Sequence, residues 1–395
     1  MLTAEIDPAQ AGFDATRLTR IDRYYQRYVD EGQLPGYLVV VARDGRIVHV
    51  AKGGYRDVGA RAALETDTQF RIYSMTKPIT SVAAMLLWEE GAFELKDPIA
   101  TFLPEFADAR VWAGGSALYP QTVPAREPVR MWHLLTHTSG LTYGFHHVHP
   151  LDAVYRDHGY EFGAPRGTTL EAAVRTWASL PLLFEPGTEF NYSVSTDVLG
   201  RVLEVIDGRP LDQLLHERIF APLGMVDTRF GNADPDRLAA LYDLGLKRND
   251  RMGDVVRTMP AFLSGGGGLI STAADYHRFT TALLDDALLA PRTFALMGRN
   301  HLPGELRAVA RPTIADIAHD GLGFGLGFRV VLDPARTKLA GPAGELAWSG
   351  LAGTTFWLDP AARIAVSFYT QLLRSSAYPL RTRLRQLVYQ ALTRT

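Results

Sequence analysis

The residues of this chain that could do chemistry begin with Ser74 and Lys77, which lie three positions apart in the stretch FRIYSMTKPI. On a helix, residues three apart share a face, with Cβ atoms about 5–6 Å apart. Lys77 Nζ could then take the proton of Ser74 Oγ and activate a weak nucleophile, if burial favours the neutral form of the lysine. The spacing alone is equally consistent with a serine that caps a helix and a lysine that lies in solvent.

The residues that follow Lys77 favour the catalytic interpretation. Pro78 and the run ITSVAAMLLW are typical of a buried helix, and a lysine at the mouth of such a helix needs polar partners. The free N–H groups of a helix N-terminus also favour negative charge that develops beside a serine. Together these features predict a nucleophile and its base at the start of a helix that lines a cleft.

Two further stretches could complete such a site. Tyr192, in NYSVSTDVLG, precedes an apolar helix, and a tyrosine near a Ser–Lys pair can relay a proton to a leaving group. In AWSGLAGTTFW, residues 348–350 on an edge strand would let the main chain approach a substrate closely. The N–H of Leu351 could then join that of Ser74 in an oxyanion hole. Taken singly, Tyr192 is more often a half-buried loop residue and Trp348 a core residue.

The elements that would position these residues come from both ends of the chain. DATRLTRIDRYYQRYVDEG predicts an N-terminal helix, and the β-rich runs around Asp44 and Gly45 predict a hairpin. The far end mirrors this order, with two strands around Asp359 and Pro360 and a closing amphipathic helix in YPLRTRLRQLVYQALT. We therefore expect both termini to build one antiparallel sheet with helices packed on it.

The middle of the chain has a different pattern. From Ser81 to about Phe262, helical periods dominate and are separated by connections rich in proline and glycine. We expect an α/β domain made of residues 1–80 and 265–395, with a mostly helical domain of residues 81–264 inserted into it.

Composition and charge exclude several classes of protein. Hydrophobic residues make up 47% and charged residues 21% of the chain, and the net charge is −2, so nucleic acid and anionic membranes are not expected partners. The absence of cysteine excludes disulfides, thiolate metal sites and a cysteine nucleophile. No signal peptide is visible and the longest apolar run, YLVVVA, has the length of a strand, so a cytoplasmic protein is expected.

Other motifs fit less well. The chain has no G-x-S-x-G elbow, and no GK[ST] follows the glycines of residues 265–268, which are expected to pack closely beside the cleft. The three histidines of FHHVHP are candidate metal ligands, but there is no H-E-x-x-H motif and no obvious carboxylate partner. We therefore expect no metal and no cofactor. Tyr143 and His146 are instead expected to contribute substrate-binding surface at the rim of the site.

The Ser-x-x-Lys, Tyr192 and Trp348 stretches, in this order, resemble the serine β-lactamase and penicillin-binding-protein superfamily. LLTHTSGL, GGGGLISTAAD and APLGM are similar to stretches that recur in it. The chain looks most like class C β-lactamases and family VIII carboxylesterases, from about Leu18 to the final helix. The resemblance implies a β-lactamase-like (DD-peptidase/transpeptidase-like) fold of α/β plus α type, with the cleft where the two domains meet. It also implies nucleophile Ser74, base Lys77, proton relay Tyr192, and oxyanion N–H groups of Ser74 and Leu351.

Two departures from the family's pattern bear on the substrate. Val194 stands where the Tyr-Ser/Ala-Asn motif usually has an amide that can bond an acylamino group. Trp348, followed by Ser349 and Gly350, stands where the Lys-Thr/Ser-Gly motif has a cation that helps to hold a substrate carboxylate. An aromatic surface suits apolar ligands better than anions, and the change resembles the W-x-G form of the esterase branch.

These departures predict a serine carboxylesterase that acts on small-molecule esters with short acyl chains. An acyltransferase that uses the same acyl-enzyme remains open, as does a class C-like β-lactamase or D-amino-acid peptidase. A non-catalytic binding scaffold is disfavoured, because every catalytic residue type is present.

Overall fold

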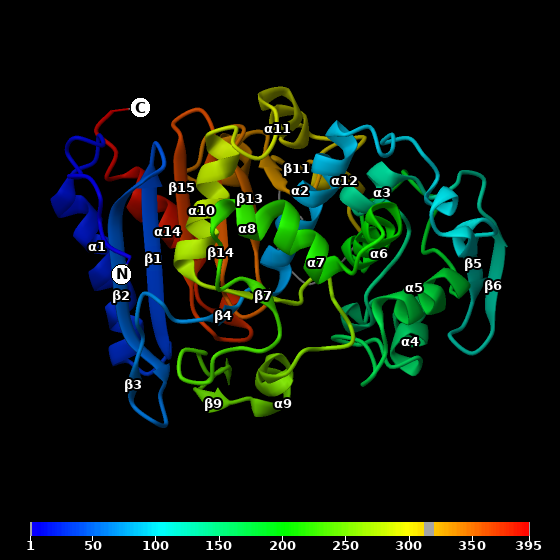
Figure 1. Ribbon diagram of the computed structural model, residues 1–395, viewed down its shortest axis with the longest axis horizontal. Helices are drawn as coiled ribbons and strands as arrows, with labels where there is room; N and C mark the ends of the chain where they lie inside the picture. Colours follow the sequence, from blue (N-terminus) through cyan, green and yellow to red (C-terminus); the bar gives the residue numbers. More distant parts are fainter. Residues whose placement is uncertain (1, 312–319, 395) are drawn as a thin grey trace.

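An eight-stranded antiparallel sheet, built from both ends of the chain, is the centre of the computed structural model, which describes residues 2–311 and 320–394 (Figure 1). Its strand order is β11-β12-β13-β14-β15-β1-β2-β3. β1 (Gly36–Arg43) pairs with β2 (Arg46–Asp57) on one side and with β15 (Ile364–Tyr369) on the other. The other strands are β3 (Ala62–Ala63), β11 (Leu322–Phe324), β12 (Arg329–Val331), β13 (Leu346–Ser349) and β14 (Thr355–Asp359). The prediction that both chain ends contribute to one sheet is confirmed.

Helices cover the sheet on both faces. Val40 of β1 belongs to one hydrophobic cluster, whereas Val39 belongs to another, because successive side chains of a strand point to opposite faces. α1 (Ala15–Asp30) and α14 (Leu380–Tyr389) pack on the face of Val39, and α10 (Ala273–Leu284) packs on the face of Val40 (Figure 1). The apolar run of β1 is therefore buried on both sides.

The two helices predicted at the chain ends are confirmed. Asp14 caps α1 by accepting a hydrogen bond from the N–H of Arg17 (2.9 Å). Beyond the end of α1, Gly32 has a φ of +66°, in the left-handed region that favours glycine. Tyr25 Oη donates to the carbonyl oxygen of Leu380 (2.8 Å), so the first and last helices are fastened to each other.

The strands at the far end differ from the prediction in two ways. The stretch between residues 346 and 369 holds three strands rather than two, because the segment 350–354 separates β13 from β14. The prediction of an edge strand is also wrong, since β13 lies between β12 and β14. The glycine-rich stretch that forms β11 and β12 has a weak strand signal in sequence. β12 pairs with Leu346 and Ala347, however, so Trp348 extends past its end.

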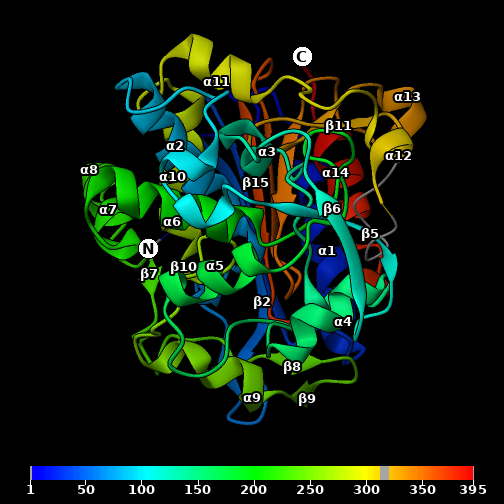
Figure 2. The same ribbon diagram turned by 90° about the vertical axis from the view of Figure 1, so that its right-hand side faces the viewer.

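The middle of the chain is mostly helical, and its helices gather beside the sheet (Figures 1 and 2). One continuous hydrophobic cluster joins them to the face of the sheet that α10 covers. The hydrophobic core is therefore continuous across the predicted domain boundaries at residues 80/81 and 264/265, and the division into two domains stays a prediction. These helices are α2 (Thr76–Glu89), α3 (Met131–Leu135), α4 (Pro150–Asp157), α5 (Leu170–Ser179), α6 (Ser195–Asp207), α7 (Leu211–Leu215), α8 (Ala221–Leu223) and α9 (Asp250–Gly253).

A hairpin projects from this helical part. β5 (Arg110–Gly115) and β6 (Pro120–Pro124) form it, and the prolines and glycines of its sequence hide the strand pattern. The remaining elements are short: β4 (Phe70–Arg71), β7 (Arg229–Phe230), β8 (Tyr242–Asp243), β9 (Lys247–Arg248), β10 (Leu269–Ser271), α11 (Pro291–Met297), α12 (Leu306–Val309) and α13 (Pro334–Thr337).

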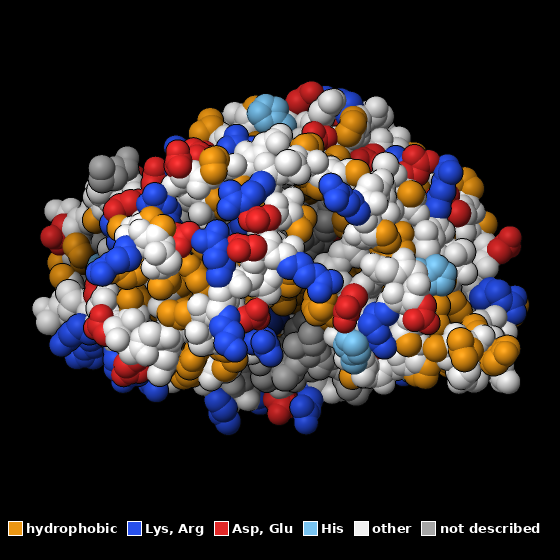
Figure 3. Space-filling model, turned by 90° about the horizontal axis from the view of Figure 1, so that it is seen from below, with side chains coloured by type: hydrophobic (Ala, Val, Ile, Leu, Met, Phe, Trp, Pro, Cys, Tyr) orange, Lys and Arg blue, Asp and Glu red, His pale blue; other side chains and the backbone are white. Residues whose placement is uncertain are grey.

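The face seen from below is hollowed near its middle, between the part that holds the sheet and the helical part (Figure 3). Among the residues that the structure describes, no helix combines the length and the apolar character that crossing a bilayer requires.

A buried histidine makes the stability of the fold depend on pH. His133 of α3 is 2% exposed, and its Nδ1 accepts the N–H of Arg130 (2.9 Å). Burial, with a smaller contribution from the charge of Arg130, lowers the pKa of His133 to about 3. In the unfolded chain a histidine has a pKa of about 6.5. Between these values the unfolded state binds more protons than the folded state, so the free energy of unfolding falls as the pH falls.

We expect His133→Asn to reduce this dependence on pH, because the amide oxygen can accept the same N–H and does not titrate. Between pH 6 and pH 4 the slope of the free energy of unfolding against pH should fall by about 1.4 kcal/mol per pH unit. Denaturant unfolding of both proteins across this range measures the slope. An unchanged slope would show that His133 titrates normally in the folded protein.

Candidate active site

Ser74 lies in a tight turn directly before α2. The 3₁₀ turn Tyr73–Met75 contains it, and the helix starts at Thr76, so Ser74 is half-buried at the helix N-terminus. Tyr73 has a φ of +44°, a conformation that costs about 1–3 kcal/mol for a residue with a bulky side chain. The turn is held by packing of its neighbours, since Ile72 and Met75 are fully buried. Strain next to a half-buried hydroxyl is typical of a reactive serine.

Tyr192 is the side chain bonded to Ser74. Its Oη donates a hydrogen bond of 2.7 Å to Ser74 Oγ, and the residue is 7% exposed. Two contacts fix the main chain around it: Asn191 Nδ2 donates to the carbonyl oxygen of Leu141 (3.0 Å), and His146 Nε2–H donates to the carbonyl oxygen of Tyr192 (2.6 Å). A hydroxyl at this distance from Oγ is within range for proton transfer.

Lys77 lies behind this pair, almost completely buried. Its Nζ donates to the carbonyl oxygen of Gly266 (2.6 Å) and to Tyr143 Oη (3.0 Å), and lies 4.6 Å from the centre of the Tyr192 ring. Among the described residues, Ser74 Oγ is not one of the hydrogen-bond partners of this ammonium. The Tyr192 side chain therefore makes the direct contact with Ser74. Lys77 contacts the ring of Tyr192 and does not contact Ser74 Oγ by a hydrogen bond. Burial raises the pKa of Tyr143 well above its usual value, which keeps that phenol protonated.

The glycine loop that receives Lys77 is fixed by Asp197, a residue that the sequence did not single out. Asp197, near the start of α6, is buried, and its Oδ1 accepts hydrogen bonds from Ser264 Oγ (2.5 Å) and from the N–H of Gly266 (2.9 Å). Burial raises the pKa of its carboxyl, and the positive charge of Lys77 opposes that rise. A Cβ at Gly266 would come within 2.6 Å of Asp197 Oδ2, so the contact requires glycine. The signal in the sequence that could have identified Asp197 is an acidic residue at the start of an apolar helix.

Trp348 and Gly350 bring β13 to the same place. The Trp348 ring centre lies 5.5 Å from that of Tyr192, and a Cβ on Gly350 would lie 2.4 Å from the carbonyl oxygen of Ile72. The strand end thus packs directly against the chain that leads to Ser74. The turn is closed by hydrogen bonds from the N–H of Gly350 to Thr354 and from that of Gly353 to Gly350, which leave the N–H of Leu351 unused within the described chain.

The other predicted residues lie in different surroundings. Ser349 Oγ shares a hydrogen bond with Thr355 Oγ1 (2.9 Å), and Val194 is buried at the start of α6. His146 supports the main chain of Tyr192 from within the core. Their roles in substrate binding stay predictions.

The histidines of FHHVHP make separate contacts. His146 bonds to Tyr192, His147 pairs with Glu161 (3.2 Å), and His149 caps α4 by accepting the N–H of Leu151 (3.1 Å). Within the described part of the chain, no group of three or more His, Asp or Glu side chains is placed to hold a metal ion.

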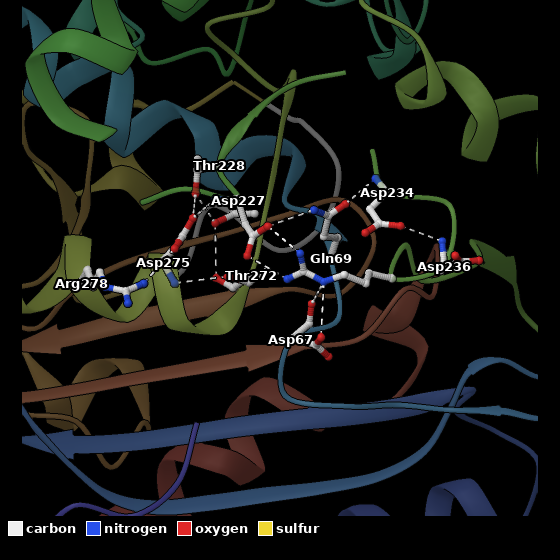
Figure 4. A network of polar contacts seen from close by, with 11 residues as sticks. Asp67, Gln69, Asp227, Thr228, Asp234, Asp236, Thr272, Asp275 and Arg278 are labelled. Atoms are coloured by element: carbon white, nitrogen blue, oxygen red, sulfur yellow. Dashed lines mark hydrogen bonds and ion pairs between the residues drawn. The ribbon is translucent and has the colours of Figure 1, made fainter. Parts of the chain in front are cut away.

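A polar network fastens the strand that enters the site (Figure 4). Gln69, which leads into β4, donates to Asp227 Oδ1 (3.3 Å), and Arg237 binds both carboxylate oxygens of Asp227 (2.7 and 2.8 Å). Arg237 thereby lowers the pKa of Asp227. At the start of α10, Asp275 Oδ2 accepts the N–H of Asp227 (2.7 Å) and the hydroxyl of Thr228 (3.0 Å). The segment that carries Ser74 is thus tied to a helix that packs on the sheet.

This fold and this arrangement of side chains define the family. A profile of the Beta-lactamase family matches residues 21–390, and the chain belongs to that family. It is 33% identical to Esterase EstB of Burkholderia gladioli, over 98% of this chain and all of that protein. It is 38% identical to Protein Rv1367c of Mycobacterium tuberculosis, over 87% of each chain.

Solved structures share the fold. EstCE1, described as a hydrolase with promiscuous acyltransferase activity, superposes with a TM-score of 0.81 at 30% identity, over 96% of this chain and 99% of that one. Simvastatin synthase (LovD) of Aspergillus terreus gives a TM-score of 0.82 at 24% identity, over 97% of this chain and all of that one. The predicted superfamily and its β-lactamase-like fold are confirmed.

We expect Gly350→Ala to slow the reaction of Ser74 with a fluorophosphonate about 100-fold, because the added Cβ displaces the end of β13 from the Ser74 turn and with it the N–H of Leu351, the predicted oxyanion donor. Gly163→Ala is the matched control, since nothing lies within 4 Å of a Cβ at that position. Mass spectrometry of the labelled protein gives the rates, and a thermal melt checks the fold. Equal rates for a folded Gly350→Ala and the wild type would show that this contact does not shape the site.

The charge of Asp197 can be separated from its hydrogen bonds. Asp197→Asn keeps an oxygen that can accept from Ser264 and Gly266 but removes a negative charge near the Lys77 ammonium. We expect Asp197→Asn to lose the acidic step of the fluorophosphonate labelling profile that reflects protonation of the Asp197 carboxyl, whose pKa burial raises. Ser264→Ala, which removes one bond and no charge, should keep this acidic step. Identical profiles for Asp197→Asn and wild type would contradict the electrostatic role.

Proposed function

We propose that the protein is a serine carboxylesterase that hydrolyses small-molecule esters with short acyl chains. The observation that carries the proposal is the 2.7 Å hydrogen bond between Tyr192 Oη and Ser74 Oγ, beside the buried Lys77 ammonium. This arrangement supplies a nucleophile and a route for its proton. EstB, an esterase by name, and EstCE1, a hydrolase by description, are relatives at 33% and 30% identity.

In the proposed reaction the Tyr192–Lys77 pair starts with one proton fewer than a phenol and an ammonium hold together. Ser74 Oγ attacks the ester carbonyl carbon while its proton passes to this pair. The N–H groups of Ser74 and Leu351 hold the oxyanion of the tetrahedral intermediate. The bond to the alcohol oxygen then breaks, and that oxygen takes the proton from Tyr192, which leaves an acyl group on Ser74. Water attacks the acyl carbon in the same way and releases the acid, which restores the serine.

The surroundings support an ester rather than an anionic β-lactam or peptide. Trp348 is buried against Tyr192, where the family's Lys-Thr/Ser-Gly motif would place a cation, and Val194 is buried where the related motif has an amide. A substrate carboxylate would thus lose a charged partner, whereas an uncharged acyl group would meet apolar surface.

Acyl transfer is the second candidate. The same acyl-enzyme can be resolved by an alcohol instead of water, and EstCE1 carries promiscuous acyltransferase activity in its description. Monacolin J acid methylbutanoyltransferase of Aspergillus terreus is a further relative, at 28% identity over 93% of each chain. The two outcomes differ only in which hydroxyl reaches the acyl carbon.

We expect Ser74→Ala to abolish turnover of p-nitrophenyl acetate and butyrate while the thermal melt stays unchanged. Tyr192→Phe should lower kcat by about 10²–10⁴-fold, because the proton route is lost and the ring remains. Fluorophosphonate labelling, followed by mass spectrometry of the peptide that carries Ser74, identifies the nucleophile. Turnover retained by Ser74→Ala would refute the assignment.

A substrate panel distinguishes the alternatives. Esters of rising acyl length, nitrocefin, and an ester with an added acceptor alcohol should be compared at equal enzyme concentration. Hydrolysis of short-chain esters well above that of nitrocefin is the expected result. A new ester formed from the acceptor in preference to free acid would favour the acyltransferase.

A further inference from the structure

Four aromatic rings form a continuous series from Ser74 to the surface. Tyr192, bonded to Ser74, has its ring centre 5.3 Å from that of Tyr143. Tyr143 stacks on Phe145, with centres 4.5 Å apart and planes inclined by 21°. Phe145 stacks on Phe162, with centres 5.6 Å apart and planes inclined by only 7°. Tyr192 is 7% exposed and Phe162 is 59% exposed, so the series leads from the buried nucleophile into solvent.

Two segments hold the outer rings in this stacked position. The 3₁₀ turn Gly144–His146 carries Phe145, and Gly144 lies so close to the second segment that a Cβ would be 2.4 Å from the carbonyl oxygen of Tyr160. Arg156 donates to the carbonyl oxygen of Gly144 (2.5 Å), and His147 bonds to Glu161 (3.2 Å). These contacts hold the segment that precedes Phe162 against the turn that carries Phe145.

We propose that Tyr143, Phe145 and Phe162 form an aromatic wall that binds the alcohol part of the substrate, and that this part is a flat apolar group such as an aryl or fused-ring system. The inference rests on the proposed esterase reaction. In that reaction Tyr192 protonates the alcohol oxygen, and the wall begins at Tyr192, so it is the alcohol rather than the acyl group that extends along the wall. The acyl group lies on the other side of the scissile bond, toward the oxyanion donors.

The chemistry of the wall defines the class of alcohol. A stack of rings presents ring edges along its side and an open ring face at its outer end, Phe162, and both favour contact with another apolar π-system. An exposed phenylalanine gains most when a ligand covers it. Within the described residues, the charged groups next to the wall are engaged: Lys77 donates to Gly266 and to Tyr143 itself, Arg156 donates to the main chain, and His147 and Glu161 bond to each other. A charged or strongly hydrated alcohol would therefore find no free partner of opposite charge there.

The test compares two acetates that share an acyl group, 2-naphthyl acetate and ethyl acetate, with wild type and Phe162→Leu. The leucine keeps apolar volume at an exposed position and removes the ring. We expect kcat/KM for 2-naphthyl acetate to fall about ten-fold more than kcat/KM for ethyl acetate. Because both substrates give the same acetyl-enzyme, kcat should change little where deacylation limits turnover. Tyr119→Ala, which removes another exposed ring, in the turn of the β5–β6 hairpin, should alter kcat/KM for neither substrate.

Three results would overturn the proposal. An equal fall for both acetates would mean that Phe162 only supports the fold. No fall for either would mean that the wall does not touch the substrate. A loss of kcat/KM in Phe162→Leu that is larger for 2-naphthyl butyrate than for 2-naphthyl acetate would place the acyl group on the wall.

Failure of the esterase assignment is recognised separately. In that case wild type turns over no ester in a manner that depends on Ser74. Calorimetric titration with 2-naphthyl acetate then still measures binding to the wall. It compares Ser74→Ala with the double variant Ser74→Ala, Phe162→Leu. Weaker binding with the added change supports the wall as a binding surface, and equal binding overturns it.

Discussion

The burial of one ammonium group organises the site. Lys77 is 2% exposed, and a cation in the interior is unfavourable unless polar groups surround it. The carbonyl oxygen of Gly266, the hydroxyl of Tyr143 and the ring of Tyr192 provide that environment, and Asp197 adds a negative charge one layer further out. These groups come from three segments, because Tyr192 lies just before α6 and Asp197 lies in its first turn. The position of Lys77 thus requires α2, α6, the Tyr143 loop and the glycine loop to meet at one point, and the same meeting places Tyr192 against the nucleophile.

The sheet fulfils a second requirement, which is to bring the two chain ends together. β15 pairs with β1 over residues 38–43 and with β14 on its other side, and β14 in turn pairs with β13, so the end of β13 is held in the same sheet as β1. Gly350 then packs against the carbonyl oxygen of Ile72, closer than any residue with a Cβ could. The polar network around Asp227 and Asp275 fastens the same entering segment from the side of α10 (Figure 4). A strained turn at Tyr73 persists because its flanks are fixed in this way.

Aromatic rings surround the Ser74–Tyr192 pair. Trp348 packs on Tyr192 and on Phe324, and the series of rings from Tyr143 to Phe162 leads outward. The polar atoms of the site are concentrated around Ser74, and under the proposed function the apolar side chains around them would select a substrate by shape and hydrophobicity. Such a division suits uncharged esters, for which binding energy comes from burying apolar area and bond cleavage needs only a few well-placed donors.

The amino-acid sequence determined the elements whose signals are local. The apolar run of β1 and the capped α1 each depend on neighbouring residues, so their prediction holds in the structure. The tertiary structure alone decided contacts between distant segments. Asp197 reaches Gly266 across 69 positions, and β11 and β12 pair beside β13 despite a glycine-rich sequence. No periodicity reports such contacts, because they follow from how complete elements pack. For the same reason, Lys77 reaches Tyr143 and Gly266 rather than Ser74 Oγ, an outcome that helical spacing could not reveal.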